Sequence, residues 1–299
     1  MRVFLTGATG FVGSHILTEL LAAGHQVIGN SRSGAGALHL ERAGAAVHRG
    51  DLSDPAELAK GAESADAVIH TAFDHDFACY AENCEKDRRV IEAIGDVLAG
   101  SDRPLLITSA IGVGSTGPGQ FAREDVLDRD HPMPRIASEL AGLAVRERGV
   151  SVGVVRLSQI HDPVKQGLVS PLIDLARTKG ASAYVGEGGN RWSAASVEDA
   201  ARLYVLALEQ HEPGTCWHAV AEEAIPMRAI AEAIGRGLGV PVHAIAESEA
   251  GKHFGWMAPF ASFDMPGSSA VTRERLGWVP AGPTLLENLS RMDYSVAKG

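Results

Sequence analysis

The stretch TGATGFVG, residues 6–13, decides the fold of this chain. It follows a short apolar run that is typical of a buried strand, and it leads into a segment with the apolar spacing of a helix. Gly7 allows a tight turn, Gly10 lets the backbone approach a pyrophosphate, and Gly13 lets the helix pack against the strand. The helix N-terminus favours the negative charge of such a group. A glycine turn in this context predicts a dinucleotide-binding site at the start of the chain.

The end of the second expected strand indicates which dinucleotide binds. No acidic side chain follows this strand to hold the ribose hydroxyls of NAD. Arg32 can instead fork onto a 2′-phosphate, to which two neighbouring serines can donate, so we predict NADP; the alternative is that Arg32 is a solvated loop cation. Asp51 is expected either to accept from the adenine amino group or to cap the next loop or helix. The expected cofactor contacts are Thr6, Gly7, Thr9, Gly10, Phe11, Val12, Gly13, Asn30, Ser31, Arg32, Ser33, Asp51, Leu52, Thr71, Ala72, Phe73 and Ser109.

Strand-like and helix-like segments alternate through the first 160 residues. We expect strands at 2–7, 26–31, 66–73, 104–110 and 150–160, a strand with its exit loop at 45–54, and helices at 11–25, 36–45, 55–65, 80–100 and 135–148. This alternation implies right-handed crossovers and a parallel, doubly wound sheet. The later part is less regular, with helices expected at 168–180, 196–211 and 225–239 and a strand at 214–220. We predict an α/β fold with a dinucleotide-binding domain at 1–160 and a smaller α+β substrate lobe at 161–299, packed together as one body.

Composition narrows the classes of partner. A net charge of −10, spread along the chain, argues against nucleic acid or an anionic membrane as the main partner. No apolar run approaches the roughly 18 residues that span a bilayer, and the first residues lack the pattern of a signal peptide. Three cysteines without a CxxC pair favour neither a disulfide framework nor a zinc site. We expect a protein of the reducing cytoplasm that binds a small molecule and no metal, and a homodimer is left open.

Six stretches of the sequence resemble the short-chain dehydrogenase/reductase superfamily, particularly its extended and atypical members of the epimerase/dehydratase kind. They are TGATGFVG, GDLSD, DAVIHTAF, LLITSA, VVRLSQIHDP and RWSAASVEDAARLYVLALE, and the match that they carry covers nearly the whole chain. The resemblance implies a Rossmann-like fold, a nicotinamide cofactor and hydride transfer at an alcohol or carbonyl carbon.

The chain departs from the superfamily at the groups that carry out this chemistry. In the superfamily a Ser or Thr ends the fifth strand, and the next helix carries a YxxxK pair; here Ala110 stands at the hydroxyl position, with Ser109 one residue earlier. Arg135 and Glu139 replace the Tyr and the Lys. Ser138, between them, is kept. A literal YxxxK occurs at 294–298, but it lies at the end of the chain and not on the helix after the fifth strand, so we reject it.

The substituted residues predict altered chemistry. Arginine stays protonated, so Arg135 cannot donate the proton, but it can stabilise a developing alkoxide or anchor a substrate carboxylate. Glu139, one turn along the same helix, faces the same way and could accept from the nicotinamide ribose. The alternative is a helix-surface Arg–Glu pair worth about 0.3 kcal/mol.

A proton donor must then come from elsewhere. Tyr80 and Asp87 share one face of the fourth expected helix with Cys84, and Asn83 or Asp87 is a candidate for the superfamily's catalytic Asn. Asp74, His75 and Asp76 follow the fourth strand, where ligands of such sheets bind. His75 titrates most readily near neutral pH. The alternative for Asp74, His75 and Asp76 is a solvated polar loop. A metal site is not expected, because three consecutive side chains do not all point inward.

The expected substrate lobe offers further contacts. Asp74, Arg135, His161, Arg191 and Trp192 are the candidate substrate residues. For His161 the alternative is a loop cap, and for Trp192 it is packing between the lobes. The stretch KHFGWMAPF, residues 252–260, is expected to form a helix that either covers the cleft or fills core. An apolar pocket of this kind suits a hydrophobic or aromatic carbonyl compound.

Three functions remain at this point. The first is an NADP-dependent oxidoreductase of the carbonyl reductase or alcohol dehydrogenase type, with Ser109, Arg135, Glu139, Tyr80, Asp87 and His75 as candidate catalytic residues. The second is a non-catalytic NADP sensor or partner-binding protein, because the superfamily's catalytic groups are replaced. The third is an epimerase or dehydratase that retains its cofactor.

Overall fold

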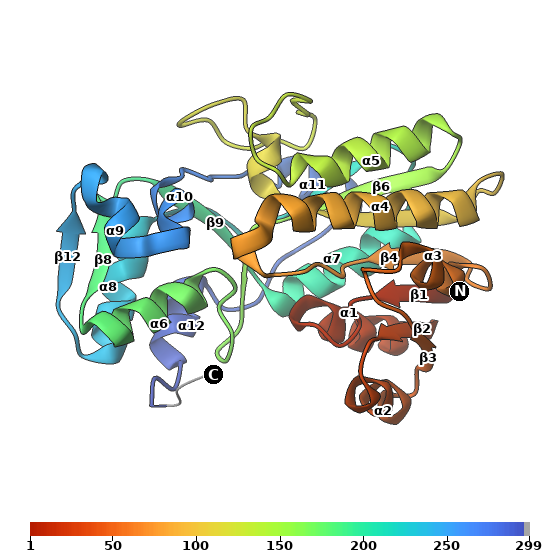
Figure 1. Ribbon diagram of the computed structural model, residues 1–299, viewed down its shortest axis with the longest axis horizontal. Helices are drawn as coiled ribbons and strands as arrows, with labels where there is room; N and C mark the ends of the chain where they lie inside the picture. The colour runs from red at the N-terminus through yellow and green to blue at the C-terminus, as the bar shows by residue number, and fades with distance from the viewer. Residues whose placement is uncertain (296–299) are drawn as a thin grey trace.

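The computed structural model describes residues 1–295, and its centre is a seven-stranded sheet in which all neighbours pair in parallel (Figure 1). The strand order is β10-β6-β5-β4-β1-β2-β3. The strands are β1 (Arg2–Thr6), β2 (Gln26–Ser31), β3 (Ala46–Arg49), β4 (Ala67–His70), β5 (Pro104–Ala110), β6 (Ser151–Leu157) and β10 (Cys216–Ala219). The strand order reverses between β1 and β4, the place where open α/β sheets bind ligands beyond their carboxyl ends.

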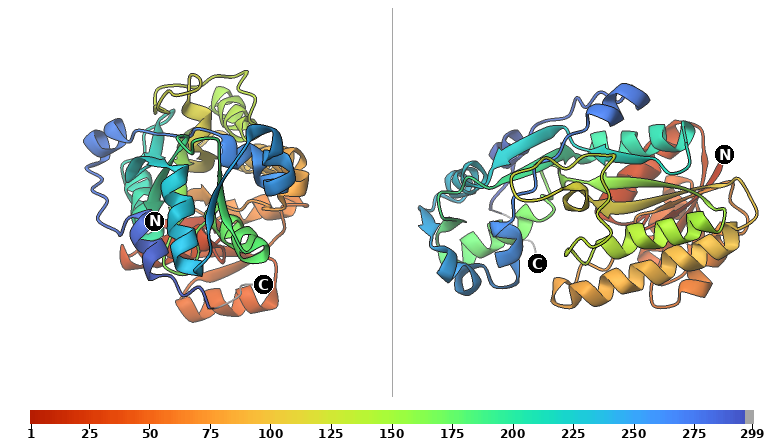
Figure 2. Two further views of the ribbon diagram at one scale, coloured as in Figure 1. Left: turned by 90° about the vertical axis from the view of Figure 1, so that its left-hand side faces the viewer. Right: turned by 90° about the horizontal axis from the view of Figure 1, so that it is seen from above.

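Helices cover both faces of this sheet, as the right-hand view of Figure 2 shows. One face carries α1 (Phe11–Ala22), α2 (Gly34–Ala43) and α7 (Val197–Glu209); the other carries α3 (Pro55–Ala59), α4 (Tyr80–Leu98) and α5 (Ile136–Glu147). Each layer buries its own apolar cluster against the strands, because a parallel sheet needs both of its faces covered. The predicted Rossmann-like, doubly wound fold is confirmed.

A smaller group of elements packs beside the carboxyl end of the sheet and has its own apolar core. Its strands are β7 (Gln159–His161), β9 (Arg191–Ser196) and β11 (Glu222–Pro226) in one sheet, and β8 (Ser182–Val185) with β12 (Val242–Ile245) in another. Its helices include α6 (Val169–Lys179), α8 (Met227–Leu238), α9 (Ala250–Phe254), α10 (Ala258–Ser262) and α12 (Leu285–Arg291), while α11 (Ala270–Leu276) lies against β10. Because α7 and β10 return to the first sheet, the chain crosses between the two parts, and the domain boundary at residue 160 stays a prediction.

Two expected elements differ from the structure. The strand expected at 150–160 is broken at Ser158, whose hydroxyl donates to the carbonyl oxygen of Ala219, so that β6 stays in the first sheet and β7 joins the second. The helix expected at 252–260 is divided into α9, a 3-10 turn and α10, because Gly255 takes a positive φ of 56° and Pro259 lies in the first turn of α10. Within residues 1–295, none of the helices is both long and apolar enough to cross a membrane.

Candidate active site

The glycine turn between β1 and α1 has the shape that a dinucleotide pyrophosphate needs. Gly7 takes a positive φ of 68°, and a Cβ there would lie 2.8 Å from the Ala72 nitrogen. A Cβ on Gly13 would overlap the carbonyl oxygen of Gly7, so α1 rests directly on the turn. Gly10 is the N-cap of α1, and no side chain caps this helix. The first N–H groups of α1 are therefore available to an anion, which fits the predicted cofactor.

The loop after β2 carries Arg32, Ser31 and Ser33, the residues expected to contact a 2′-phosphate. The hydroxyls of the two serines form hydrogen bonds within the loop that were not predicted. Arg32 is 75% exposed in its side chain, with Nη1 3.7 Å from Asp51 Oδ2. The Ser31 hydroxyl donates to the carbonyl oxygen of Ser33, so its proton is engaged, and Ser33 caps α2 by accepting from Gly36 N. Arg49, which the sequence did not single out, donates to the carbonyl oxygens of Arg32 and Ser33 at 2.7 Å. It thus fixes the loop that carries Arg32.

Asp51, the residue expected near the adenine, is engaged within its own loop. One oxygen of Asp51 accepts from the hydroxyl and the backbone N–H of Ser53, and these two hydrogen bonds lower its pKa. This oxygen of Asp51 therefore caps the loop, which was the alternative to binding the adenine. Beside the loop, α3 and α4 enclose a hollow of about 190 Å³, lined by Leu52, Ser53, Pro55, Glu82, Lys86 and Arg89.

Arg135 lies immediately before α5 and is held at the carboxyl end of β5. Its Nη1 donates to Asp87 Oδ2 at 2.8 Å, and its Nη2 donates to the carbonyl oxygen of Thr108 at 2.8 Å. The guanidinium carbon lies 4.1 Å from the ring centroid of Phe73, a cation–π contact. Arg135 is only 7% exposed. These bonds use two of the five N–H groups of a guanidinium, so the others remain able to donate.

Asp87 on α4 connects Arg135 to the glycine turn. Its Oδ1 accepts from His70 Nε2 at 3.0 Å, and His70 Nδ1 lies 2.7 Å from the Thr6 hydroxyl. The Ser138 hydroxyl donates to Oδ2 at 2.6 Å. Burial alone would raise the pKa of Asp87, but the charge of Arg135 and the hydrogen bond from His70 outweigh it and hold the pKa below its ordinary value. An ionised carboxylate that is 1% exposed cannot act as a general acid, which corrects that role for Asp87.

Glu139 does not share the surroundings of Arg135, and this corrects the expectation that the two face the same way. Its carboxylate accepts two hydrogen bonds from Arg156, from Nε at 2.8 Å and from Nη2 at 2.7 Å. Both residues are buried, and Arg156 also donates to the carbonyl oxygens of Arg123 and Val126. Since Arg156 comes from β6 beneath the helix, a buried carboxylate at this position has to pair there. Glu139 forms neither a ribose-facing acceptor nor a surface pair with Arg135.

The loop after β4 places its polar side chains unequally. Asp74 pairs with Lys86 at 2.8 Å, a hydrogen bond that lowers its pKa, and Asp76 caps the following turn. His75 is exposed as a residue, yet its ring lies 5.3 Å from that of Phe73, and desolvation, with the charge of Arg135, lowers its pKa. His75 is therefore neutral near pH 7. Burial raises the pKa of Tyr80, so its hydroxyl keeps its proton.

Ser109, His161 and Trp192 are buried, whereas Arg191 is half-buried. The Ser109 hydroxyl is buried and has no partner within residues 1–295, which fits a group that meets a ligand. Arg191 is paired with both oxygens of Asp264, at 3.1 and 2.7 Å. Trp192 packs in the lobe core, and His161 is fully buried with its Nδ1 2.8 Å from the Asn288 amide nitrogen; burial lowers its pKa to about 4. Because Trp192 is buried in this core, its expected role as an apolar wall of the substrate site is corrected.

The segment at 252–260 contributes to the lobe core, as one of its two alternatives expected, and also contacts the loop after β4. Phe254 and Met257 pack in the lobe core. The ring of Trp256 stacks on Phe77 at 4.9 Å between centroids, and Phe260 lies 6.0 Å from Tyr80. Figure 1 shows α10 next to the beginning of α4, where these rings meet. This is the contact between the second lobe and the loop after β4.

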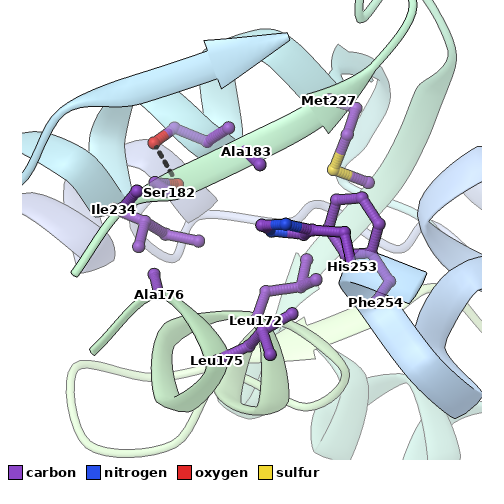
Figure 3. Close-up of a pocket in the computed structure, with 11 residues that line it drawn as sticks. Leu172, Leu175, Ala176, Ser182, Ala183, Met227, Ile234, His253 and Phe254 are labelled. Carbon is purple, nitrogen blue, oxygen red and sulfur yellow. Dashed lines mark hydrogen bonds between the residues drawn. The ribbon is translucent and has the colours of Figure 1, made fainter. Parts of the chain in front are cut away.

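Two other features lie away from the site. Figure 3 shows a hollow inside the second lobe, between α6, β8 and α8, into which His253 points. Its open volume of about 10 Å³ holds at most one water molecule. The Tyr of the rejected YxxxK pattern, Tyr294, packs against Gly237 of α8, and Lys298 lies outside the described residues.

Sequence reasoning missed His70 and Arg156, two of the residues that organise the site. Each lies within a strand, where a single polar side chain in an apolar run gives no sign of its partner. The partners are 17 residues away in both cases, His70 to Asp87 and Arg156 to Glu139, and they meet only when helices pack on the sheet. Both residues could have been identified from their position on a strand that faces the helix carrying the partner. That position can be recognised only when the order of the strands in the sheet is known.

Comparisons with known proteins agree with this geometry. A model of the NAD dependent epimerase/dehydratase family matches residues 3–219. The chain is 45% identical to an uncharacterised protein of Schizosaccharomyces pombe, over 98% of this chain and 100% of that one, and 40% identical to one of Saccharomyces cerevisiae, over 99% and 100%. It is 26% identical to the 2-alkyl-3-oxoalkanoate reductase of Stenotrophomonas maltophilia, over 81% of this chain and 77% of that one.

Among solved structures, the UDP-glucose 4-epimerase of Thermus thermophilus in complex with NAD is similar with a TM-score of 0.73 and 20% identity, over 100% of both chains. At this identity the likeness shows the fold. The family match reaches all seven strands of the first sheet, and the glycine turn has the shape described above. The chain belongs to the NAD dependent epimerase/dehydratase family, within the short-chain dehydrogenase/reductase superfamily.

Proposed function

We propose that this protein is an NADPH-dependent reductase that acts on a carbonyl group, and that Arg135 takes the place of the usual tyrosine as the group that holds the substrate oxygen. The observation that carries the proposal is the guanidinium of Arg135, fixed by Asp87 and Thr108 with further N–H groups able to donate. Family membership and the similarity to a reductase support an oxidoreductase of this kind.

NADPH is preferred over NADH because of the loop after β2. Arg32 is exposed and close to where the adenosine ribose would lie, and no carboxylate at residues 30–33 opposes a 2′-phosphate. Arg49 holds the loop backbone and adds a second positive charge nearby. Ser33 keeps its hydroxyl proton available, since it caps α2 only as an acceptor.

The residues of the chain divide the remaining chemistry. The nicotinamide, when bound, supplies a hydride to the carbonyl carbon. As the carbonyl bond opens, its electron pair moves to the oxygen, where N–H groups of Arg135 and the hydroxyl of Ser109 donate to the developing charge. The proton that completes the alcohol comes from the Tyr80 hydroxyl through a bridging water. Burial raises the pKa of this hydroxyl, so it gives up its proton only once the more basic alkoxide has formed. Tyr80 then regains a proton from solvent.

The proposal is tested by following the oxidation of NADPH and of NADH with a panel of aldehydes and ketones. We expect turnover with NADPH. Arg32→Ala should raise the KM for NADPH by about 10- to 100-fold, as the loss of a charged hydrogen bond implies, and should leave the KM for NADH unchanged. Tight NADPH binding without turnover of any panel member would contradict the proposal and favour a non-catalytic nucleotide sensor.

A further inference from the structure

Six aromatic rings form a continuous row from Arg135 to the surface, and we call this row the aromatic seam. Its members are Phe73, His75, Phe77 and Tyr80 from the loop after β4 and the start of α4, with Trp256 and Phe260 from the second lobe. Neighbouring centroids along the row lie 4.9 to 6.3 Å apart. At its inner end, the ring of Phe73 lies under the guanidinium of Arg135. The seam therefore adjoins the group proposed to hold the substrate oxygen.

The outer end of the seam is a stacked pair that a ligand can replace. Trp256 and Phe77 lie nearly parallel, with an angle of 6° between their planes, yet Trp256 remains 46% exposed. Trp256 lies in a 3-10 turn, Gly255–Met257, that begins at the glycine with positive φ. A large indole on a short turn gives up little packing when it moves, and another flat ring can take its place against Phe77.

The seam carries no unbalanced charge. His75 is neutral near pH 7, because desolvation and the charge of Arg135 lower its pKa. Asp74 beside it is paired with Lys86, and the charge of Arg135 is balanced by Asp87. A charged substrate would lose its hydration among these rings.

In the second lobe, the candidate cation Arg191 is already paired. Arg191, the candidate that could hold a diphosphate, is engaged through its backbone and side chain with Asp264 and donates its remaining contact to the carbonyl oxygen of Gly119. A diphosphate would have to displace a carboxylate that forms a bidentate pair.

We infer that the seam is the substrate-binding wall and that the substrate is an uncharged carbonyl compound with a planar aromatic ring, which stacks on Phe77 where Trp256 now lies. The inference rests on the proposed reductase function for the carbonyl group, while the ring and the absence of charge come from the seam itself. The carbonyl then points inward along Phe73 toward Arg135.

Binding can be measured apart from turnover through tryptophan fluorescence of the protein saturated with NADP⁺. Trp192, Trp217 and Trp278 are fully buried, so a ligand at the seam perturbs Trp256 above all. The probes are benzaldehyde, cyclohexanecarbaldehyde and UDP-glucose. We expect benzaldehyde to bind about tenfold more tightly than its saturated counterpart, as ring stacking implies, and UDP-glucose not to compete.

A pair of variants locates the binding. Phe77→Leu keeps an apolar side chain but removes the stacking face, and it should abolish the preference for benzaldehyde. Val279→Ala, at an exposed apolar residue outside the seam, should leave that preference unchanged. Equal binding of the two aldehydes, or competition by UDP-glucose, overturns the inference even if some other carbonyl is reduced. Preferential binding of benzaldehyde without any NADPH oxidation would support the seam as a binding wall for an aromatic ring, and it would overturn the proposed reductase function instead.

Discussion

Arg135 and Glu139 lie one helical turn apart at the start of α5, yet their side chains enter different parts of the protein. Arg135 meets Asp87 and the ring of Phe73 at the edge of the candidate site. Glu139 meets Arg156 within the layer between α5 and the sheet, and that arginine also holds the loop at 123–126. The two residues replace a catalytic pair that acts as a unit in the superfamily. The two substitutions therefore lie in different surroundings: Arg135 lies at the candidate site, whereas Glu139 belongs to the packed layer beneath α5.

The largest effect is expected from Glu139→Gln. This change leaves the buried charge of Arg156 without its counter-ion, and breaking a buried pair in this way costs about 3–5 kcal/mol. Urea unfolding should report the loss, while kcat/KM of the folded protein stays within a few-fold. Arg148→Gln, which breaks the exposed pair with Asp96 just beyond the end of the same helix, is the control and should cost less than about 1 kcal/mol. A stable Glu139→Gln protein without activity would place Glu139 in the chemistry.

Arg135→Lys should show the opposite pattern. The lysine keeps a positive charge beside Asp87 but loses the planar fork and the hydrogen bond to the Thr108 carbonyl oxygen, so the free energy of unfolding should fall by about 1–2 kcal/mol, less than in Glu139→Gln. We expect kcat/KM to fall by about 10²–10³, the usual loss when one oxyanion donor is removed. Steady-state rates with NADPH and thermal unfolding, measured on the same preparation, separate the two effects. Equal losses of stability and activity would contradict the separation of roles.

A smaller effect concerns acid stability on the Glu139 side. Burial, and then the charge of Arg156, lowers the pKa of His218 to about 3. The unfolded chain binds this proton near its ordinary pKa of about 6.5, so the stability that neutral His218 contributes is full above that pH. It is lost as pH falls toward the folded pKa, at about 1.4 kcal/mol per pH unit.

Urea unfolding at about pH 7 and about pH 5 compares the wild type with His218→Asn. The variant should lose this part of the pH dependence, while buried His161 contributes equally to both proteins and cancels in the difference. An unchanged slope in the variant would show that His218 takes up its proton in the folded state.

The smallest effect belongs to Phe73→Leu on the Arg135 side. The change keeps apolar cover over the guanidinium but removes the ring face, a loss of about 0.5–1 kcal/mol. Activity should fall by about two- to fivefold, and the unfolding of the Glu139–Arg156 region, followed by hydrogen exchange, should not change. A Phe73→Leu protein with full activity would remove the cation–π contact from the account of the site.

Local and long-range features of the site differed in how far the sequence predicted them. The glycine turn depends on the spacing of Gly7, Gly10 and Gly13, so one short stretch sufficed to place it. The partners of Arg135 and Glu139 depend on which strand lies under α5, and sequence spacing favoured a shared face that does not exist. The break at Ser158 depends on the carbonyl oxygen of Ala219, far along the chain. Pairs of residues between a helix and the sheet are determined by how these elements pack. The pattern of one segment therefore does not predict which residues pair.

The chain of hydrogen bonds from Thr6 through His70 and Asp87 to Arg135 limits how this protein can change over evolutionary time. Restoring the tyrosine and lysine of the superfamily by two substitutions would strand Asp87 without its cation and set a lysine against Arg156. Neither single step is neutral, because each leaves a buried charge unpaired. A chain with the superfamily's pair at these two positions would therefore need compensating changes on α4 and β6.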